Sequence, residues 1–386
     1  MVEWKTIGDI SINVFAGGTP STKHEEYYDG DIPWIRSGEI DFNTITKAER
    51  NITQEGYDNS SAKLIRNGSV VMAMTGATVA KSAIVEFETS ANQSVCAIET
   101  DESIANYKYV YFYLAKDYFK IKSSAQGALT SLNLAMIKQI EIPIPSLQEQ
   151  ERIVGILDTF TASIDNIKAQ IEQRRKQYEH YRDQLLDLEG KEGVEMKKLG
   201  EVTSPDCSLS YGIVQPGDDI EDGVPVVRPI DLTGLFVYRK GLKKTTYEIS
   251  DSYKRTILSG DEILFCVRGT TGVMSLASTE LKGCNVTRGI VPISFKNNLT
   301  KIFVFYVLKS HNLQRKIADK TNGTALKQIN VKDLRQLPIP LPSLQEQERI
   351  VGILDTFEAS IKNLEAQLEQ RQKQYEYYRE KLLTFE

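Results

Sequence analysis

The sequence predicts an α+β protein: two mixed α/β domains separated by two long antiparallel coiled-coil helices, with an internal pseudo-two-fold. Three observations predict this fold. A segment occurs twice, each copy carries a heptad pattern of apolar residues, and strand-like segments precede each copy. The 386 residues are too many for one compact core and fit two domains or more.

The duplication is the strongest of these features. The residues PSLQEQERIVGILDTF occur at 145–160 and again, unchanged, at 342–357. The preceding segments are related more faintly, as IPWIRSGEI at 32–40 is to VPVVRPIDL at 224–232. Variable and repeated segments therefore alternate, which indicates that two helical arms stayed nearly identical while the domains between them diverged.

Each repeated segment predicts the start of a long helix. Ser146 followed by Glu149, and Ser343 followed by Glu346, form capping boxes directly after a proline. At about 1.5 Å per residue, each helix would be roughly 60–65 Å long.

A coiled-coil seam follows each helix start. Apolar residues recur at alternating steps of three and four from Leu157 to Leu188 and from Leu354 to Phe385. Only Arg174 and Arg371 interrupt it. We expect these arginines to extend toward solvent or to pair with a facing carboxylate, and as a second hypothesis to set the register. We expect the seam tyrosines to pack between the helices rather than stack on nucleic acid: Tyr178, Tyr181, Tyr375 and Tyr378.

The direction of the second helix follows from connectivity. The first helix delivers the chain to the second domain, and the two ends of a domain often lie close together. The second helix would then start where the first one stops, and it must run antiparallel to bury its seam.

The variable domains are predicted to be rich in strands. GSVVMAM, AKSAIVEF, EILFCV and GIVPISF are short apolar runs bounded by turn-forming residues. Each domain closes with an aromatic, helix-like stretch, at 107–123 and 301–319, which we interpret as structural. Trp34 is expected in the core.

Composition and charge restrict the function classes. No apolar run is long enough for a membrane span or a secretory signal, and four scattered cysteines with three histidines suggest neither a zinc site nor a disulfide framework. We expect a cytoplasmic protein. The net charge is −5, but residues 191–338 carry 22 Lys and Arg against 16 Asp and Glu, so a local basic surface remains available for phosphate.

The whole chain resembles the DNA specificity subunit of type I restriction-modification systems. The resemblance is carried by GGTPSTKHEEYYDGDIPWIRSGEI at 17–40, by the glycine turns around Gly76 and Gly269, and by the IPIPSLQEQERIVGILD arm with its IPLP counterpart. It implies target-recognition domains at 1–144 and 191–341, and helical arms at 145–190 and 342–386. In the second half LSYGIVQPGDD replaces GGTPS, so contacts of that loop cannot be transferred.

The resemblance also implies partners and a mechanism. The chain would carry no active site and would bind a bipartite, asymmetric DNA sequence, one half-site per domain, with the arms setting the spacer. It would recruit two modification subunits, which use S-adenosylmethionine to methylate adenines, and restriction subunits, which use ATP and Mg and cut DNA. The sequence itself contains no GxxxxGK[ST] and no Asn/Asp-Pro-Pro-aromatic motif.

Candidate DNA contacts are polar and basic side chains of the variable domains. Each is a candidate for base or phosphate contact, with a solvated charge or a salt bridge as the alternative. The Arg239–Lys244 cluster is predicted to touch phosphate, and Arg268 sits in an apparent hairpin from which it could bind guanine. The candidates are Ser21, Lys23, Arg36, Thr75, Thr78, Lys81 and Asn92 in the first domain, and Arg228, Lys243, Lys244, Lys254, Arg255, Arg268, Thr270, Thr271 and Arg288 in the second.

Two alternative functions stay open at this point. A coiled-coil tether presenting two ligand-binding domains would explain the duplication and the negative net charge, but not the basic second domain. An independent nuclease or methyltransferase is disfavoured by the missing motifs. Co-purification of a methyltransferase, or intrinsic activity of the isolated chain, would discriminate between these classes.

Overall fold

The computed structural model describes residues 2–125, 131–322 and 327–385. The chain forms two compact units, residues 1–168 with 366–386 (unit 1) and residues 169–365 (unit 2). Each unit combines one strand-rich region with parts of both long helices. The sequence-based domain boundaries therefore stay predictions, since the compact units divide the chain inside the helices.

Unit 1 is built on a five-stranded sheet of order β2-β9-β6-β7-β4 and a three-stranded sheet of order β5-β3-β8. A separate ribbon pairs β1 with β10, so the chain enters and leaves the strand-rich region side by side. The elements are β1 (Glu3–Thr6), β2 (Ser11–Ala16), η1 (Glu25–Tyr27), β3 (Tyr28–Ile35), η2 (Ser37–Glu39), β4 (Thr44–Ile45), β5 (Arg50–Ile52), α1 (Gln54–Asp58), β6 (Ser69–Ala73), η3 (Gly76–Thr78), β7 (Ser82–Val85), β8 (Ser90–Ala91), β9 (Val95–Thr100), α2 (Tyr107–Lys116), α3 (Tyr118–Ser124), α4 (Leu134–Lys138), β10 (Glu141–Ile144) and the start of α5 (Leu147–Leu186).

The core of unit 1 lies between the five-stranded sheet and α2. Strands β6 and β9 are buried along their whole length, as expected for short apolar runs at the centre of a sheet. Asn106 caps α2 by accepting the Lys108 N–H at 2.9 Å. The buried Tyr109 hydroxyl donates to the Pro143 carbonyl at 2.7 Å, so α2 is also fixed to β10. The structural interpretation of this aromatic stretch is confirmed.

Unit 2 is built on a four-stranded sheet of order β13-β16-β15-β18 and a three-stranded sheet of order β14-β12-β17. Its entry and exit strands, β11 and β19, also form an antiparallel ribbon. The elements are β11 (Glu195–Lys198), α6 (Leu199–Val202), β12 (Val224–Val227), η4 (Pro229–Asp231), β13 (Phe236–Val237), β14 (Lys243–Thr245), α7 (Tyr247–Ser252), η5 (Lys254–Thr256), β15 (Ile263–Cys266), β16 (Met274–Ala277), η6 (Thr279–Leu281), β17 (Asn285–Val286), β18 (Ile290–Ile293), α8 (Asn298–Lys309), α9 (His311–Asp319), α10 (Val331–Arg335), β19 (Pro338–Leu341) and the start of α11 (Leu344–Leu383).

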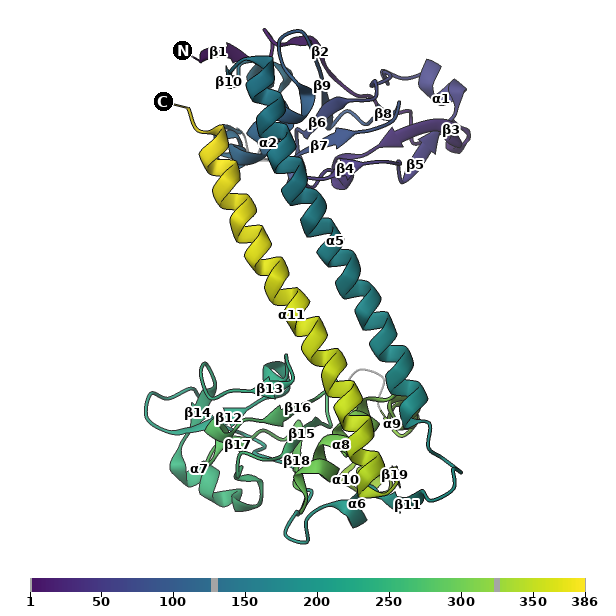
Figure 1. Cartoon of the computed structure of the whole chain (residues 1–386), viewed down its shortest axis with the longest axis vertical. Helices are drawn as coiled ribbons and strands as arrows, with labels where there is room; N and C mark the ends of the chain where they lie inside the picture. Colours follow the sequence, from purple (N-terminus) through teal and green to yellow (C-terminus); the bar gives the residue numbers. More distant parts are fainter. Residues whose placement is uncertain (1, 126–130, 323–326, 386) are drawn as a thin grey trace. The chain divides into compact units, whose positions relative to one another are not determined.

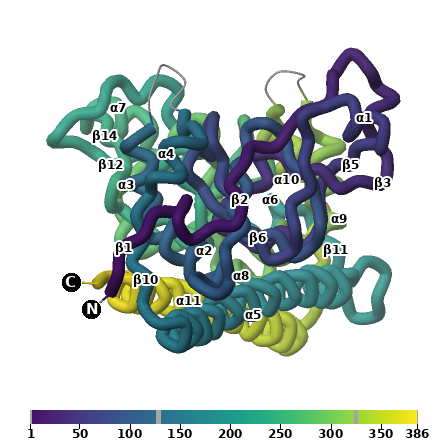
Figure 2. The backbone as a smooth tube through the Cα atoms, turned by 90° about the horizontal axis from the view of Figure 1, so that it is seen from above, coloured from purple at the N-terminus to yellow at the C-terminus, as the bar shows by residue number. Residues whose placement is uncertain are grey.

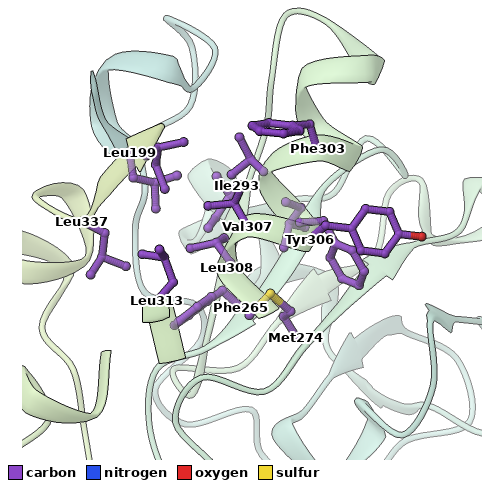
Figure 3. Close-up of a cluster of buried hydrophobic side chains, with 14 of the residues drawn as sticks. Leu199, Phe265, Met274, Ile293, Phe303, Tyr306, Val307, Leu308, Leu313 and Leu337 are labelled. Atoms are coloured by element: carbon purple, nitrogen blue, oxygen red, sulfur yellow. The ribbon is translucent and has the colours of Figure 1, made fainter. Parts of the chain in front are cut away.

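The core of unit 2 gathers apolar side chains from the sheet and from α6, α8 and α9. Figure 3 shows Leu199, Phe265 and Leu313 pointing toward one another, although their elements are far apart in sequence. The Tyr306 hydroxyl points away from this cluster and donates to the Asp355 carboxylate of α11 at 2.5 Å. Burial raises the pKa of Tyr306, so the hydroxyl stays protonated and remains a donor.

The two strand-rich regions share one topology. The order β4-β7-β6-β9 of unit 1 recurs as β13-β16-β15-β18, and β5-β3-β8 recurs as β14-β12-β17, with the same parallel and antiparallel pairings. The outer strand β2 of unit 1 has no counterpart in the sheet of unit 2, where α6 follows the entry strand within the described residues. This difference lies directly before the segment in which LSYGIVQPGDD replaces GGTPS.

The long helices α5 and α11 contain 40 residues each, or about 60 Å at 1.5 Å per residue. Their predicted start is confirmed, because Ser146 Oγ and Ser343 Oγ accept the N–H groups three residues later at 3.3 Å. The glutamate half of the predicted capping box does not form within the described residues. The Glu149 carboxylate accepts two bonds from Arg152, at 2.7 and 2.8 Å, because a guanidinium on the next turn offers two donors.

The helices run antiparallel in each unit, as predicted (Figure 1). In unit 1, Phe160 of α5 stacks on Tyr378 of α11 with ring centroids 5.3 Å apart, and Leu157 shares a buried cluster with Leu383. In unit 2, Arg175 binds Glu365 at 2.6 Å and the Tyr178 hydroxyl binds Glu358 at 3.0 Å. Strand β1 lies beside the end of α11 in unit 1 (Figure 1 and Figure 2).

Of the two expectations for the seam arginines, pairing with a facing carboxylate is not found within the described residues. The Arg174 guanidinium lies 5.8 Å from the centroid of Phe357 in unit 2, and Arg371 lies 5.6 Å from that of Phe160 in unit 1. Because the helices are antiparallel, each arginine meets the seam phenylalanine of the other helix, whose ring quadrupole attracts the cation.

The predicted seam also extends beyond the helix ends. The last α5 residue is Leu186 and the last α11 residue is Leu383. Leu188 therefore lies outside the helix and is buried in the core of unit 2, and Phe385 packs on the core of unit 1. The packing role of the seam tyrosines is confirmed, since Tyr181 stacks on Phe357 at 5.5 Å.

Within the described residues no helix is long and apolar enough to cross a membrane.

Candidate nucleic-acid interface

In unit 1, hydrogen bonds join three turns that carry candidate DNA contacts. The Asn92 N–H donates to the Ile35 carbonyl at 3.0 Å, which fixes the turn after β8 beside η2. The Thr78 hydroxyl donates to the Ser37 carbonyl at 2.9 Å, which fixes η3 beside η2 as well. These turns bring together Arg36, Thr75, Thr78 and Asn92.

The loop with Ser21 and Lys23 is attached to the same site from the other side. The Gly18 N–H donates to the Ala91 carbonyl at 2.8 Å, and buried Trp34 donates from Nε1 to the Gly18 carbonyl at 3.0 Å. The expectation that Trp34 is a core residue is confirmed. Ser21 and Lys23 are exposed on this loop.

Two cations of the unit 1 site are already paired with carboxylates. Arg36 Nη2 lies 2.5 Å from Glu49, and Lys81 Nζ lies 2.5 Å from Asp41. For these two residues the salt bridge that was the alternative interpretation is present. A phosphate or a base would have to compete with the carboxylate, so the unit 1 site offers mainly neutral donors and acceptors.

Unit 2 repeats the η2 turn as η4. The Arg228 N–H donates to the Asp231 carboxylate at 2.8 Å, just as the Arg36 N–H donates to Glu39 at 2.7 Å. The Arg228 guanidinium also binds Asp231, at 2.8 and 3.1 Å, and this hydrogen bonding raises the pKa of the arginine. Arg228 therefore shapes its own turn.

The predicted hairpin around Arg268 is confirmed, since β15 and β16 pair antiparallel. Gly269 in its connection has a φ of +92°, like Gly76 in the corresponding turn of unit 1 with +80°, a conformation that favours glycine. The Thr271 hydroxyl donates to the Lys327 carbonyl at 3.0 Å, and Thr270 Oγ1 lies 3.4 Å from Cys266 Sγ. The threonines thus hold the turn that presents Arg268.

Arg268 and Arg288 lie in neighbouring turns of unit 2. The Val267 N–H donates to the Gly289 carbonyl at 2.8 Å, and a side chain at Gly289 would collide with the Pro229 ring of η4 at 2.6 Å. Neither arginine side chain makes an ion pair in residues 2–125, 131–322 and 327–385. Two arginines without an ion pair in the described residues thus lie in turns next to η4, whereas Arg36 and Lys81 of unit 1 are paired.

The remaining candidates lie on other elements of unit 2. Lys243 and Lys244 are on the edge strand β14, where Lys244 Nζ donates to the Glu221 carbonyl at 2.6 Å. Lys254 and Arg255 are exposed on η5, beside Tyr211 in an open cavity of about 510 Å³. No hydrogen bond within the described residues connects these four side chains to the turns that carry Arg268 and Arg288.

The sequence matches the profile of the family described as "Type I restriction modification DNA specificity domain" over residues 1–174 and 191–371. The chain belongs to this family. It is therefore a specificity component of a type I restriction-modification system. The family serves DNA recognition in such systems.

Curated relatives agree with the family assignment. The chain is 29% identical to the Escherichia coli type I restriction enzyme EcoR124I/EcoR124II specificity subunit over 406 aligned positions. This alignment covers 100% of this chain and 94% of that protein. It is 28% identical to the EcoBI specificity subunit of the same organism over 72% of this chain, and it spans 64% of that protein's length.

Solved structures share the fold. The S subunit of a type I restriction-modification system from M. genitalium matches with a TM-score of 0.60 at 16% identity, covering 100% of this chain and 97% of that one. A chain from a study of the assembly and conformational transition of the type I R-M system matches with a TM-score of 0.62 at 19% identity, covering 99% and 97%.

Sequence reasoning missed the acidic residues that shape this specificity subunit's candidate interface. Glu39 and Asp231 follow their arginines by three residues, a spacing typical of a capped turn, so this signal was present. Asp41 and Glu49 carry no such local signal, because their partners meet them only through the tertiary fold.

Proposed function

We propose that the chain is the non-catalytic subunit that recognises a bipartite, asymmetric DNA sequence, one half-site per target-recognition domain. The observation that carries this proposal is a shared scaffold with different side chains. Corresponding turns hold Arg36, Thr75 and Asn92 in one region and Arg228, Arg268 and Arg288 in the other. One scaffold presenting two different sets of donors suits two different base sequences.

The helices are proposed to set the spacer between the half-sites. Both are uninterrupted over 40 residues, which supports a stiff connection rather than a flexible linker. Insertion of seven residues into each helix preserves the heptad and adds about 10 Å, or about three base pairs of B-DNA. We expect a spacer about three base pairs longer, and an unchanged spacer would contradict this role.

The first turns of the two helices are proposed to bind two copies of the modification subunit. Within the repeat, Leu157 and Leu354 are buried and explained by packing inside the chain. Packing inside the chain does not explain other identical residues, since Leu147 and Leu344 at the helix starts are 37% and 54% exposed. Exposed residues that stay identical in both copies are consistent with one partner surface that is used twice.

Gly155 and Gly352 strengthen this argument. Glycine inside a helix costs about 1 kcal/mol relative to alanine. A Cβ at either position would meet nothing within 4 Å, so the packing of this chain does not require glycine there. Glycine permits another chain to approach the helix backbone closely.

This docking proposal is tested by counting bound partners. Gly155→Leu and Gly352→Leu should each lower the number of modification subunits per chain from two to one, and the double variant should bind none. Gln170→Leu and Gln367→Leu, which change exposed positions later in the same helices, are the matched controls. Native mass spectrometry measures the stoichiometry. Two bound copies on the double variant would refute the docking surface.

DNA recognition is tested on the complex with its modification subunits. Arg268→Ala and Arg288→Ala should relax the sequence requirement within one half-site, because guanidinium groups discriminate bases. Lys243→Ala should weaken binding about equally on all sequences and reduce its salt dependence, as loss of a phosphate contact does. Selection from a randomised DNA pool measures both. Relaxed specificity in both half-sites together would contradict the assignment of one half-site to each domain.

The proposal assigns the chemistry to partners. S-adenosylmethionine would be bound by the modification subunits, and ATP and Mg by the restriction subunits that join the same complex, in the cytoplasm. Within the described residues no group of three or more His, Cys, Asp or Glu side chains could hold a metal ion.

A further inference from the structure

The exposed side chain of Ile230 distinguishes the η4 turn of unit 2 from its counterpart in unit 1. The two turns correspond residue by residue, with Arg228 and Asp231 in the places of Arg36 and Glu39. The tip of the turn is Gly38 in unit 1 and Ile230 in unit 2. Ile230 is 73% exposed, the largest exposed fraction among the large apolar side chains that the structure describes in unit 2.

Neither residue is required by the scaffold. Gly38 does not have a positive φ, and a Cβ there would meet nothing within 4 Å. Ile230 contributes little to the core, because most of its surface faces solvent. The fold therefore leaves this position free to vary, as expected of a position that contacts something outside the chain.

The surroundings of Ile230 indicate what that ligand is. A single exposed isoleucine is ordinary on a protein surface. This one follows Pro229, whose ring lies against Gly289. Gly289 comes directly after Arg288, and a Cβ placed on it would lie 3.7 Å from the Arg268 carbonyl oxygen. An apolar tip on a turn that lies next to the turns of Arg268 and Arg288 matches the major groove, where guanine offers two acceptors and thymine offers its C5 methyl group.

We propose that Ile230 recognises the C5 methyl group of a thymine in the half-site bound by unit 2, next to a base pair contacted by Arg268 or Arg288. This inference rests on the proposed DNA-recognition function and adds a specificity-determining residue to it. The corresponding Gly38 makes no such contact, so the half-site of unit 1 lacks this methyl discrimination at its turn.

The test removes the methyl group from the DNA and the side chain from the protein. The probes are duplexes of the recognised sequence in which each thymine is replaced, one at a time, by deoxyuridine. With the wild-type complex, one replacement in the unit 2 half-site should raise Kd about fourfold, the factor expected for exposing one methyl group. Ile230→Ala should raise Kd on the thymine duplex by a similar factor and abolish the difference between thymine and deoxyuridine.

Ile12→Ala is the matched control, since Ile12 of β2 is 58% exposed and belongs to unit 1. It should retain the full sensitivity to deoxyuridine. Three results would overturn the inference: Ile230→Ala keeps the sensitivity, no thymine of that half-site is sensitive in the wild type, or Ile230→Ala weakens binding independently of the methyl group, as a wedge between base steps would. A complex without sequence preference would instead refute the proposed function itself.

Discussion

Phe357 is expected to stabilise the helix pair of unit 2 through its ring rather than through its apolar volume alone. It stacks on Tyr181 at 5.5 Å and receives the Arg174 guanidinium at 5.8 Å. An aromatic pair contributes about 0.5–1.5 kcal/mol, and a partly exposed cation–π contact about 0.5–1 kcal/mol. Phe357→Leu retains an apolar side chain and should therefore cost about 1–2.5 kcal/mol of unfolding free energy.

A double-mutant cycle isolates the arginine contribution. Phe357→Leu is combined with Arg174→Met, and thermal unfolding is followed for the four proteins. The coupling energy should be about 0.5–1 kcal/mol. Arg175→Met is the control, because Arg175 binds Glu365 and is expected to show no coupling to Phe357. The pair Phe160 and Arg371 of unit 1 should reproduce the coupling. Zero coupling in both units, or equal coupling for Arg175, would refute the reasoning.

Three further predictions concern single interactions. Tyr306→Phe removes the hydrogen bond to the Asp355 carboxylate and should lower the unfolding free energy by about 1.5–3 kcal/mol, whereas Tyr238→Phe on an exposed residue should change the thermal midpoint little. Gly17→Ala places a Cβ 2.2 Å from the Ala91 carbonyl oxygen and should speed amide hydrogen exchange in the loop of Ser21 and Lys23, while Gly38→Ala, with open space, should not. Hydrogen bonds from Arg152 and Arg349 hold the pKa values of Glu149 and Glu346 below the ordinary 4.5. Their stabilisation is present above pH 4.5 and lost as pH falls through the folded-state values, so Arg152→Met with Arg349→Met should flatten the acid side of a stability–pH curve by less than about 1 kcal/mol at these exposed sites.

The helices were predictable because their signals are local. The proline, the serine cap and the heptad spacing all lie within one segment, and the duplication supplies the same segment twice. The connectivity then required the antiparallel direction. The partner of Arg174 was not predictable in this way, because Phe357 comes opposite it only after the two helices are aligned.

The candidate interface was only partly predictable for a related reason. The sequence shows the glycine turns at Gly76 and Gly269. It also shows Arg36 and Arg228, which directly precede η2 and η4. Which cations are neutralised is not, since Asp41 meets Lys81 through the pairing of distant segments. The contrast between the paired Arg36 and Lys81 of unit 1 and the unpaired Arg268 and Arg288 of unit 2 therefore required the structure.

The most direct test of the proposed function exchanges residues 191–341 for the corresponding region of another family member that has a different specificity. The exchanged chain is expressed with its modification subunits, and methylated adenines are mapped by sequencing the host DNA. One half of the methylated sequence should change to that of the donor, while the other half and the spacer stay as they were. A methylated sequence that does not change, or that changes in both halves, would contradict the assignment of one half-site to each domain.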